Sequence, residues 1–179
     1  MFMNSSKIDI LCIQETHLRG AEYYELEGFL VALSGGSPDI SGRSHAGVGF
    51  IVSPHVTRSV ISFSAIDDRV AALKIKVPGG TLTLMSAYAP HSGHTFETRE
   101  AFFSTVTTSV KEPTRHSSTL ILGDFNAKLG RVMGGEEEMV GKFVFKSDVA
   151  QDGIATSNRS LLVSCAYPRT SQLQTPTSM

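Results

Sequence analysis

The chain has 179 residues, of which 41% are hydrophobic and 18% are charged, and its formal net charge is −1. This length suits one domain with a sizeable core, and the composition excludes a disordered chain. The nearly neutral charge neither supports nor excludes a nucleic-acid partner, although proteins that bind a duplex usually carry a basic face.

Strand patterns dominate the first half of the chain. Apolar runs predict strands at residues 8–14, 29–33, 46–52, 56–63, 70–77 and 81–87. The last two are joined by Pro78-Gly79-Gly80, which predicts a hairpin. The segment 18–29 predicts a short helix, because Tyr23, Tyr24 and Leu26 fit one side of it. Short sequential strands with tight turns predict an antiparallel sheet.

The clearest helix pattern covers residues 95–111. Phe103, Val106 and Val110 repeat at helical spacing, and Thr95 can cap the first turn. An apolar run at residues 118–122 predicts one more strand.

The remaining segments are less regular. Residues 134–138 contain three consecutive glutamates and are expected to form a solvated acidic loop. Residues 158–165 predict a last helix with Leu161, Leu162 and Cys165 facing inward. We expect one domain over 1–165 and a loose tail over 166–179, which is rich in Thr, Ser, Gln and Pro.

Three of the apolar strands end in side chains that suit a metal or a phosphate. These ends are Gln14-Glu15-Thr16-His17, Tyr88-Ala89-Pro90-His91 and Gly123-Asp124-Phe125-Asn126. Asp124 and Asn126 are two residues apart, so on an extended backbone they point to the same side. Alone, this pair fits a turn capped by Asp and Asn equally well. Its recurrence with two further polar strand ends favours a ligand site at a sheet edge.

Together these motifs resemble the endonuclease/exonuclease/phosphatase superfamily, which has the DNase I-like fold. Gln-Glu-Thr-His, Ser-Ala-Tyr-Ala-Pro and Gly-Asp-Phe-Asn-Ala are most similar to the endonuclease domains of LINE-type (non-LTR) retrotransposons. The resemblance runs from about Lys7 to about Leu162. It implies an α/β fold in the form of a four-layer α/β/β/α sandwich.

The resemblance implies catalytic roles for four residues. Glu15 matches the ligand of Mg²⁺, for which Mn²⁺ is a potential substitute. Asp124 matches the residue that orients or deprotonates the attacking water, and Asn126 matches the one that holds this water or the scissile phosphate. Tyr88 matches a tyrosine that donates to the phosphate or, as phenolate, stabilises it in the transition state.

Two further residues are candidates for substrate binding. His91 stands where apurinic/apyrimidinic endonucleases carry an Asn that contacts the substrate, although a simple loop histidine is the alternative. Arg69 opens a strand, as a basic residue often does in these domains, and is a candidate phosphate contact. Pairing of Arg69 with Asp67 or Asp68 is the interpretation that its neighbours favour.

Two parts of the family's site are missing from this sequence. The first is an opening strand with a metal-associated Asn, and the second is a Ser-Asp-His motif whose His contacts the scissile phosphate. Ser147-Asp148 is followed by Val149 and comes too soon after Asn126 to replace that motif. We therefore expect an incomplete sandwich in which both edge strands are missing. We also expect a catalytic rate that is lower by orders of magnitude.

The leading functional hypothesis is a magnesium-dependent DNA endonuclease that leaves a 3′-hydroxyl to prime reverse transcription. DNA and a fused reverse transcriptase domain are the expected partners. One alternative is a catalytically silent fragment or binding module of the same fold. Another is a phosphatase or phosphodiesterase that acts on small or lipid phosphoesters.

The cellular compartment is predicted from what the sequence contains. Its two cysteines, Cys12 and Cys165, form neither a disulfide framework nor a zinc motif, and Cys12 fits a small core residue. The first residues lack the apolar region of a signal peptide, and no run is long enough to cross a bilayer. We expect a nuclear or cytoplasmic protein that is not secreted and has no membrane partner.

Overall fold

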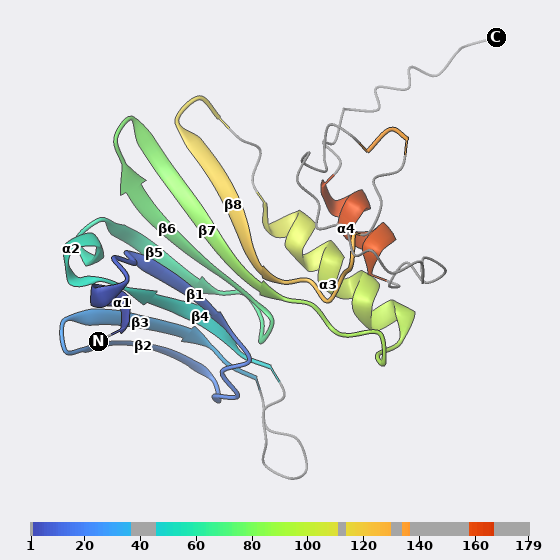
Figure 1. Cartoon of the computed structure of the whole chain (residues 1–179), viewed down its shortest axis with the longest axis horizontal. Coiled ribbons are helices and arrows are strands. Elements are labelled where there is room, and N and C mark those ends of the chain that lie inside the picture. Colours follow the sequence, from blue (N-terminus) through green and yellow to red (C-terminus); the bar gives the residue numbers. More distant parts are fainter. Residues whose placement is uncertain (1, 37–45, 111–113, 130–133, 137–157, 167–179) are drawn as a thin grey trace. The chain divides into compact units, whose positions relative to one another are not determined.

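A computed structural model describes residues 2–36, 46–110, 114–129, 134–136 and 158–166 of the chain (Figure 1). The chain divides into two compact units, Met1–Asn126 and Ala127–Met179. The first unit contains both β-sheets. The predicted tail lies outside the described residues except for Ala166.

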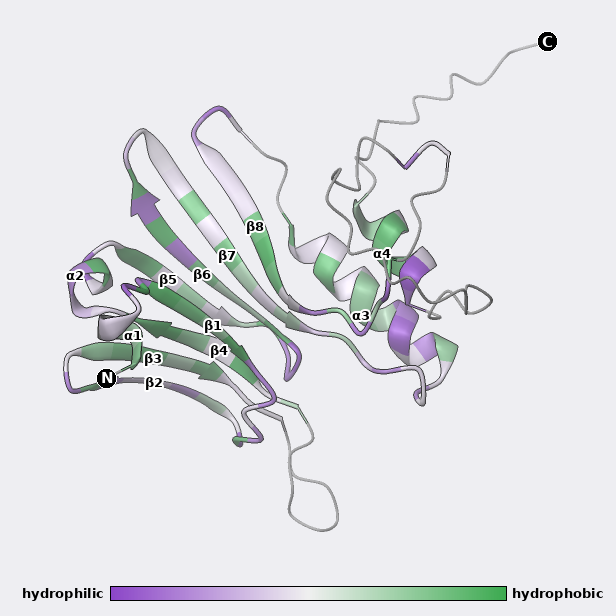
Figure 2. Ribbon diagram, in the orientation of Figure 1, coloured by the Kyte–Doolittle hydropathy of each residue, from purple (hydrophilic) through white to green (hydrophobic). Residues whose placement is uncertain are grey.

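The first sheet is antiparallel. Its four strands lie in the order β1 (Ile10–Gln14), β4 (Val48–Val52), β3 (Phe29–Ser34) and β2 (Ala21–Leu26). Figure 2 shows β3 and β4 as largely hydrophobic, whereas β2 carries hydrophilic positions. All six residues of β2 are exposed, as expected for an edge strand.

The second sheet is mixed. Its strands lie in the order β5 (Val60–Ala65), β6 (Val70–Val77), β7 (Gly80–Tyr88) and β8 (Ser117–Asp124). β5, β6 and β7 are antiparallel neighbours, but β7 and β8 are parallel. A parallel pair needs a long crossover connection, and the helix α3 (Phe96–Ser109) lies in it. The antiparallel prediction, which concerned the sequential strands up to residue 87, agrees with the pairing of β5, β6 and β7.

The core lies between the two sheets. Val48, Phe50 and Val52 of β4 are fully buried and cluster with Leu73 and Leu84 of the second sheet. Cys12 packs against this cluster as predicted, and burial raises the pKa of its thiol to about 11. Two packed sheets with accompanying helices confirm the predicted α/β class.

Four helices are described. α3 begins as predicted, since Thr95 accepts a hydrogen bond from the Thr98 N–H and Glu97 lies in the first turn. α1 (Phe2–Ser5) and α2 (Pro54–Thr57) are single turns, and α4 (Arg159–Ala166) belongs to the second unit. None of these described helices has the length and apolar character that a membrane crossing would need.

The structure corrects several local predictions. The segment expected to be a helix forms β2, because it pairs with β3 along its length. The strand expected over 56–63 starts at Val60, since Pro54 opens α2 instead. Glu136 is buried in an ion pair with Arg159, so this part of the acidic run is not solvated. Leu161, Leu162 and Cys165 are half-buried, whereas Arg159 is the buried residue of α4.

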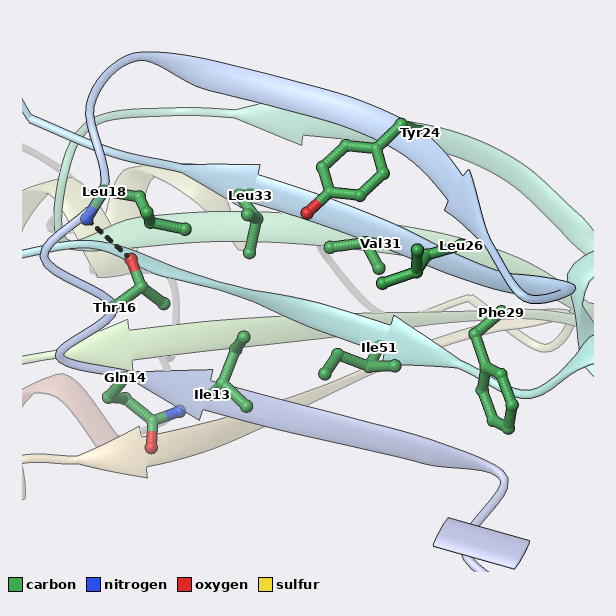
Figure 3. A pocket seen from close by; sticks show the side chains of 10 residues that line it. All are labelled: Ile13, Gln14, Thr16, Leu18, Tyr24, Leu26, Phe29, Val31, Leu33 and Ile51. Carbon is green, nitrogen blue, oxygen red and sulfur yellow. Dashed lines mark hydrogen bonds between the residues drawn. The ribbon is translucent and has the colours of Figure 1, made fainter. Parts of the chain in front are cut away.

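The outer face of the first sheet carries an apolar hollow of about 410 Å³ (Figure 3). Ile13, Val31, Leu33 and Ile51 supply apolar side chains from three strands. Gln14, Thr16 and Tyr24 add hydrogen-bonding side chains to the lining, but it contains no charged group to bind a phosphate. A phosphate-binding site is therefore expected elsewhere, at the strand ends.

Candidate functional site

The parallel pairing of β7 with β8 brings two predicted site residues together. Tyr88 and Asp124 are the last residues of these strands and are direct partners in the register. Gly123 permits this close approach, because a Cβ added there would lie 1.8 Å from the Ala87 carbonyl oxygen. Paired residues in neighbouring strands share a face of the sheet, so both side chains stand on one side.

Glu15 joins this pair from the other sheet. It follows β1 directly, is exposed, and has a left-handed backbone with φ 54°. The Glu15 carboxylate lies close enough to the Tyr88 hydroxyl to raise its pKa through hydrogen bonding and through its negative charge. Non-glycine residues rarely adopt this conformation, and those that do are often held at functional sites.

The environment of Tyr88 favours its protonated phenol. Burial raises the pKa of the Tyr88 phenol. The hydrogen bond to Glu15 and the negative charges of Glu15 and Asp124 raise this pKa further. The positive charge of Arg69 acts in the opposite direction. The neutral hydroxyl is a hydrogen-bond donor, as the contact with Glu15 requires.

The guanidinium of Arg69 contacts Tyr88, whereas the acidic neighbour Asp67 interacts with Arg69 through the backbone N–H and through charge. Its guanidinium carbon lies 5.1 Å from the centroid of the Tyr88 ring, and its Nη1 donates to the Tyr88 carbonyl oxygen at 3.3 Å. Asp67 instead accepts the backbone N–H of Arg69 at 2.8 Å. Burial raises the pKa of the Asp67 carboxyl. Its hydrogen bonds to the backbone lower that pKa in part.

Asp124 and Asn126 form a tight turn after β8. The Asn126 N–H donates to Asp124 Oδ1 at 2.8 Å, and Asn126 is left-handed with φ 47°. The expected extended geometry is thus wrong, and the turn interpretation describes the backbone. Asn126 Nδ2 donates to the Ala89 carbonyl oxygen at 2.7 Å, which fixes the amide and directs its Oδ1 away from this bond.

The turn after β7 is tied to the same end of the sheet. The Ala89 N–H donates to the Asp124 carbonyl oxygen at 2.8 Å. Two residues later, the exposed His91 accepts the Gly93 N–H at Nδ1, at 3.0 Å. Its ring centroid lies 4.6 Å from that of His94. Burial lowers the pKa of His94, and the nearby His91 and Arg69 lower it further.

The structure therefore gathers five of the six predicted site residues through direct contacts. Tyr88 contacts Glu15 and Arg69, pairs with Asp124, and is one residue from Ala89, which holds Asn126. His91 lies on the adjoining turn.

The donor set fits a metal ion that retains most of its water. No group of three or more His, Cys, Asp or Glu side chains is placed to hold a metal within the ranges that the structure describes. Mg²⁺ typically takes one or two carboxylates and keeps several waters. The exposed Glu15 carboxylate, with Asp124 on the neighbouring strand end, satisfies this pattern.

Sequence reasoning assigned no role to two residues beside the site. Gln14 Nε2 donates to Ser86 Oγ at 3.0 Å, and Ser86 Oγ donates to the Ile13 carbonyl oxygen at 3.1 Å. A serine within an apolar strand was the available signal, since a buried hydroxyl needs a partner.

The model of the Endonuclease/Exonuclease/phosphatase family matches residues 2–135. No curated protein matches the chain.

Solved structures of three relatives are similar to the chain. The AP endonuclease LMAP from Leishmania major is 16% identical over 92% of this chain and 58% of that chain, with a TM-score of 0.55. The endonuclease domain of TRAS1, a telomere-specific non-LTR retrotransposon, is 20% identical over 70% of this chain and 52% of that chain, with a TM-score of 0.46. An endonuclease/exonuclease/phosphatase family protein from Leptotrichia buccalis C-1013-b is 12% identical over 71% of this chain and 58% of that chain, with a TM-score of 0.49.

The likeness to the Leishmania major structure bears on the fold. The Leishmania major structure agrees with the predicted DNase I-like α/β architecture in incomplete form. The chain spans 52–58% of the length of the three solved structures.

Proposed function

Because the chain belongs to the Endonuclease/Exonuclease/phosphatase family, we propose that it is a magnesium-dependent phosphodiester hydrolase of the retrotransposon-endonuclease type. Such an enzyme nicks DNA and leaves a 3′-hydroxyl. The observation that carries the proposal is the contact of Tyr88 with Glu15 beside the Asp124–Asn126 turn. The three motifs that contain these residues support a nuclease over other members of the family.

Phosphodiester hydrolysis needs a positioned water and stabilisation of charge on the phosphate. Asp124 is exposed, and its Oδ1 already accepts the Asn126 N–H, so its Oδ2 is the oxygen we assign to the attacking water. Asn126 Oδ1 accepts a hydrogen from the same water, because Nδ2 is engaged by Ala89. These two residues orient the water, and Asp124 takes its proton.

The opposite side of the phosphate is assigned to the cationic and phenolic groups. When the phosphate binds, the Tyr88 hydroxyl turns its single proton from Glu15 to a non-bridging oxygen, and Arg69 keeps the Tyr88 ring in place through its face. The His91 imidazole accepts at Nδ1 from Gly93, so in its neutral form Nε2 carries the proton and is a donor to the DNA backbone.

Glu15 is the residue that would hold Mg²⁺ or, in its place, Mn²⁺. When bound, the ion would stabilise negative charge on the phosphate and on the departing oxygen. DNA is the proposed substrate, and a reverse transcriptase domain is the proposed partner in a full-length element.

A silent binding module of the same fold is the second candidate. A phosphatase that acts on small phosphoesters uses the same residues, so substrate choice must be measured.

Nicking of supercoiled plasmid by the purified chain, with Mg²⁺ or with EDTA, tests the proposal. We expect Mg²⁺-dependent nicking that Asp124→Ala lowers by about 100-fold or more, as for loss of a general base. Asp9→Asn is the matched control, since Asp9 precedes β1 and lies at the end opposite Glu15. Turnover of bis(p-nitrophenyl) phosphate without nicking would favour the small-substrate alternative. Neither activity in a folded chain would overturn the proposal in favour of the silent module.

A further inference from the structure

Ser86 is a polar residue in the apolar interface between the two sheets. It lies in β7, is completely buried, and is surrounded in the strand by the buried Met85 and Ala87. Leu84, on the same face two residues earlier, belongs to the core cluster. An alanine would fit this environment without the cost of removing a hydroxyl from water.

Both hydrogen bonds of the Ser86 hydroxyl go to the end of β1 in the other sheet. It donates to the Ile13 carbonyl oxygen at 3.1 Å and accepts from Gln14 Nε2 at 3.0 Å. Donor and acceptor are both used, so the buried group is satisfied. The link joins β7 to β1 at the residue that precedes Glu15.

The chain beyond Glu15 is anchored as well. The Thr16 N–H donates to the Gly47 carbonyl oxygen at 3.1 Å, and the His17 N–H donates to the Ala46 carbonyl oxygen at 3.0 Å. Gly47 allows this approach, because a Cβ there would lie 2.2 Å from Thr16 Oγ1. Glu15 is thus held in its left-handed conformation from both sides. Ser86 holds the residue that precedes it, and the segment that leads into β4 holds the two residues that follow it.

Ser86 and Tyr88 are two residues apart in one strand, so their side chains share a face. A fixed Ser86–Gln14 link therefore sets how far the Glu15 carboxylate lies from the Tyr88 hydroxyl. We propose that Ser86 and Gln14 are positioning residues that hold Glu15 against Tyr88 across the two sheets. This proposal rests on the proposed function for its effect on catalysis, but the geometry that it predicts is measurable without activity.

The test compares Ser86→Ala, which removes the hydroxyl, with Ser86→Thr, which keeps it. Removing a group that orients a metal ligand typically weakens metal binding about 10- to 100-fold. We expect Ser86→Ala to weaken Mg²⁺ binding in calorimetry by at least about tenfold, and to lower kcat for nicking while KM for DNA stays unchanged. Ser86→Thr should restore both.

Ser53→Ala is the matched control. Ser53 is also a buried serine whose hydroxyl contacts a side chain, His55, but it follows β4 and its N–H binds the Asp9 carbonyl oxygen before β1. It should alter the melting temperature without changing Mg²⁺ affinity. Gln14→Met removes the other partner of the link at similar volume and should reproduce Ser86→Ala, which keeps the test valid if Ser86→Ala fails to fold.

A readout independent of activity separates the two proposals. The backbone amide signals of Glu15 and Tyr88 in NMR spectra should shift together in Ser86→Ala and return in Ser86→Thr. If the wild-type chain does not nick DNA but these shifts occur, the proposed function fails and the positioning role stands. If the signals and Mg²⁺ affinity are unchanged in both Ser86→Ala and Gln14→Met, the positioning role is overturned.

Discussion

At the scale of single residues, the charge of Glu15 should decide metal affinity. Glu15→Gln keeps the size and the hydrogen-bond acceptor for Tyr88, and both residues bear the same left-handed strain, so mainly the charge is lost. We expect at least about tenfold weaker Mg²⁺ binding, equivalent to about 1.4 kcal/mol, in isothermal titration calorimetry.

Glu27 offers a close control for this substitution. It is also an exposed glutamate with a left-handed backbone, φ 51°, but it lies in the β2–β3 turn. Glu27→Gln should leave the isotherm unchanged. An unchanged isotherm for Glu15→Gln would refute the ligand assignment, and an equal loss in both variants would indicate a nonspecific charge effect.

Residue contacts could be predicted from the sequence where strand ends dictate them. Tyr88 and Asp124 could be placed at one edge because each ends an apolar strand, and three such ends were enough to identify the family. The partner of Arg69 could not be predicted from the sequence. Its acidic neighbours are close in the chain, whereas Tyr88 is brought close to it only by the register of β6 with β7. The burial of Glu136 likewise depends on Arg159, 23 residues away.

At the scale of elements, the pairing of β7 with β8 should depend on Gly123. Its φ is +154°, and a Cβ would lie 1.8 Å from the Ala87 carbonyl oxygen, which belongs to the backbone and cannot move aside cheaply. We expect Gly123→Ala to cost about 3 kcal/mol in the free energy of unfolding, at the upper end for overpacking. Chemical denaturation measures this loss, which should be accompanied by loss of Mg²⁺-dependent nicking because Asp124 is displaced from Tyr88.

Gly79→Ala separates the close contact from backbone strain. Gly79 also has a positive φ, +84°, but a Cβ there would meet nothing within 4 Å. Its cost should be about 1 kcal/mol, the ordinary penalty for a left-handed alanine. Equal costs at the two positions would show that the approach of β8 to β7 does not require glycine.

The element that the sequence misassigned shows what a local pattern leaves out. Residues 21–26 have no alternation of buried and exposed positions, because every residue of β2 is exposed at the sheet edge. Their strand conformation depends on pairing with β3 and on stacking of Tyr23 against Phe63, with ring centroids 6.1 Å apart. Such tertiary contacts override intrinsic preference.

In the molecule as a whole, a substitution that destabilises one of the two compact units should leave the stability of the other unchanged. All six candidate site residues lie within Met1–Asn126. The second unit has its own polar link, in which Arg159 binds Glu136 through two bonds, at 2.9 and 2.5 Å, and donates from Nε to the Leu129 carbonyl oxygen at 2.7 Å. The pair is buried, so removing one charge leaves the other without compensation.

Glu136→Gln should therefore destabilise the second unit by about 3 kcal/mol, the lower end for breaking a buried ion pair. Hydrogen exchange followed by mass spectrometry measures this unit by unit. We expect faster exchange in peptides that cover residues 158–166 and unchanged exchange around Glu15, Tyr88 and Asp124, with Mg²⁺ affinity retained. Glu97→Gln is a control, because Glu97 is an exposed glutamate of the first unit whose pKa is lowered by bonds at the start of α3. Faster exchange throughout both units in Glu136→Gln would show that the chain unfolds as one cooperative body and that the site depends on the second unit for its stability.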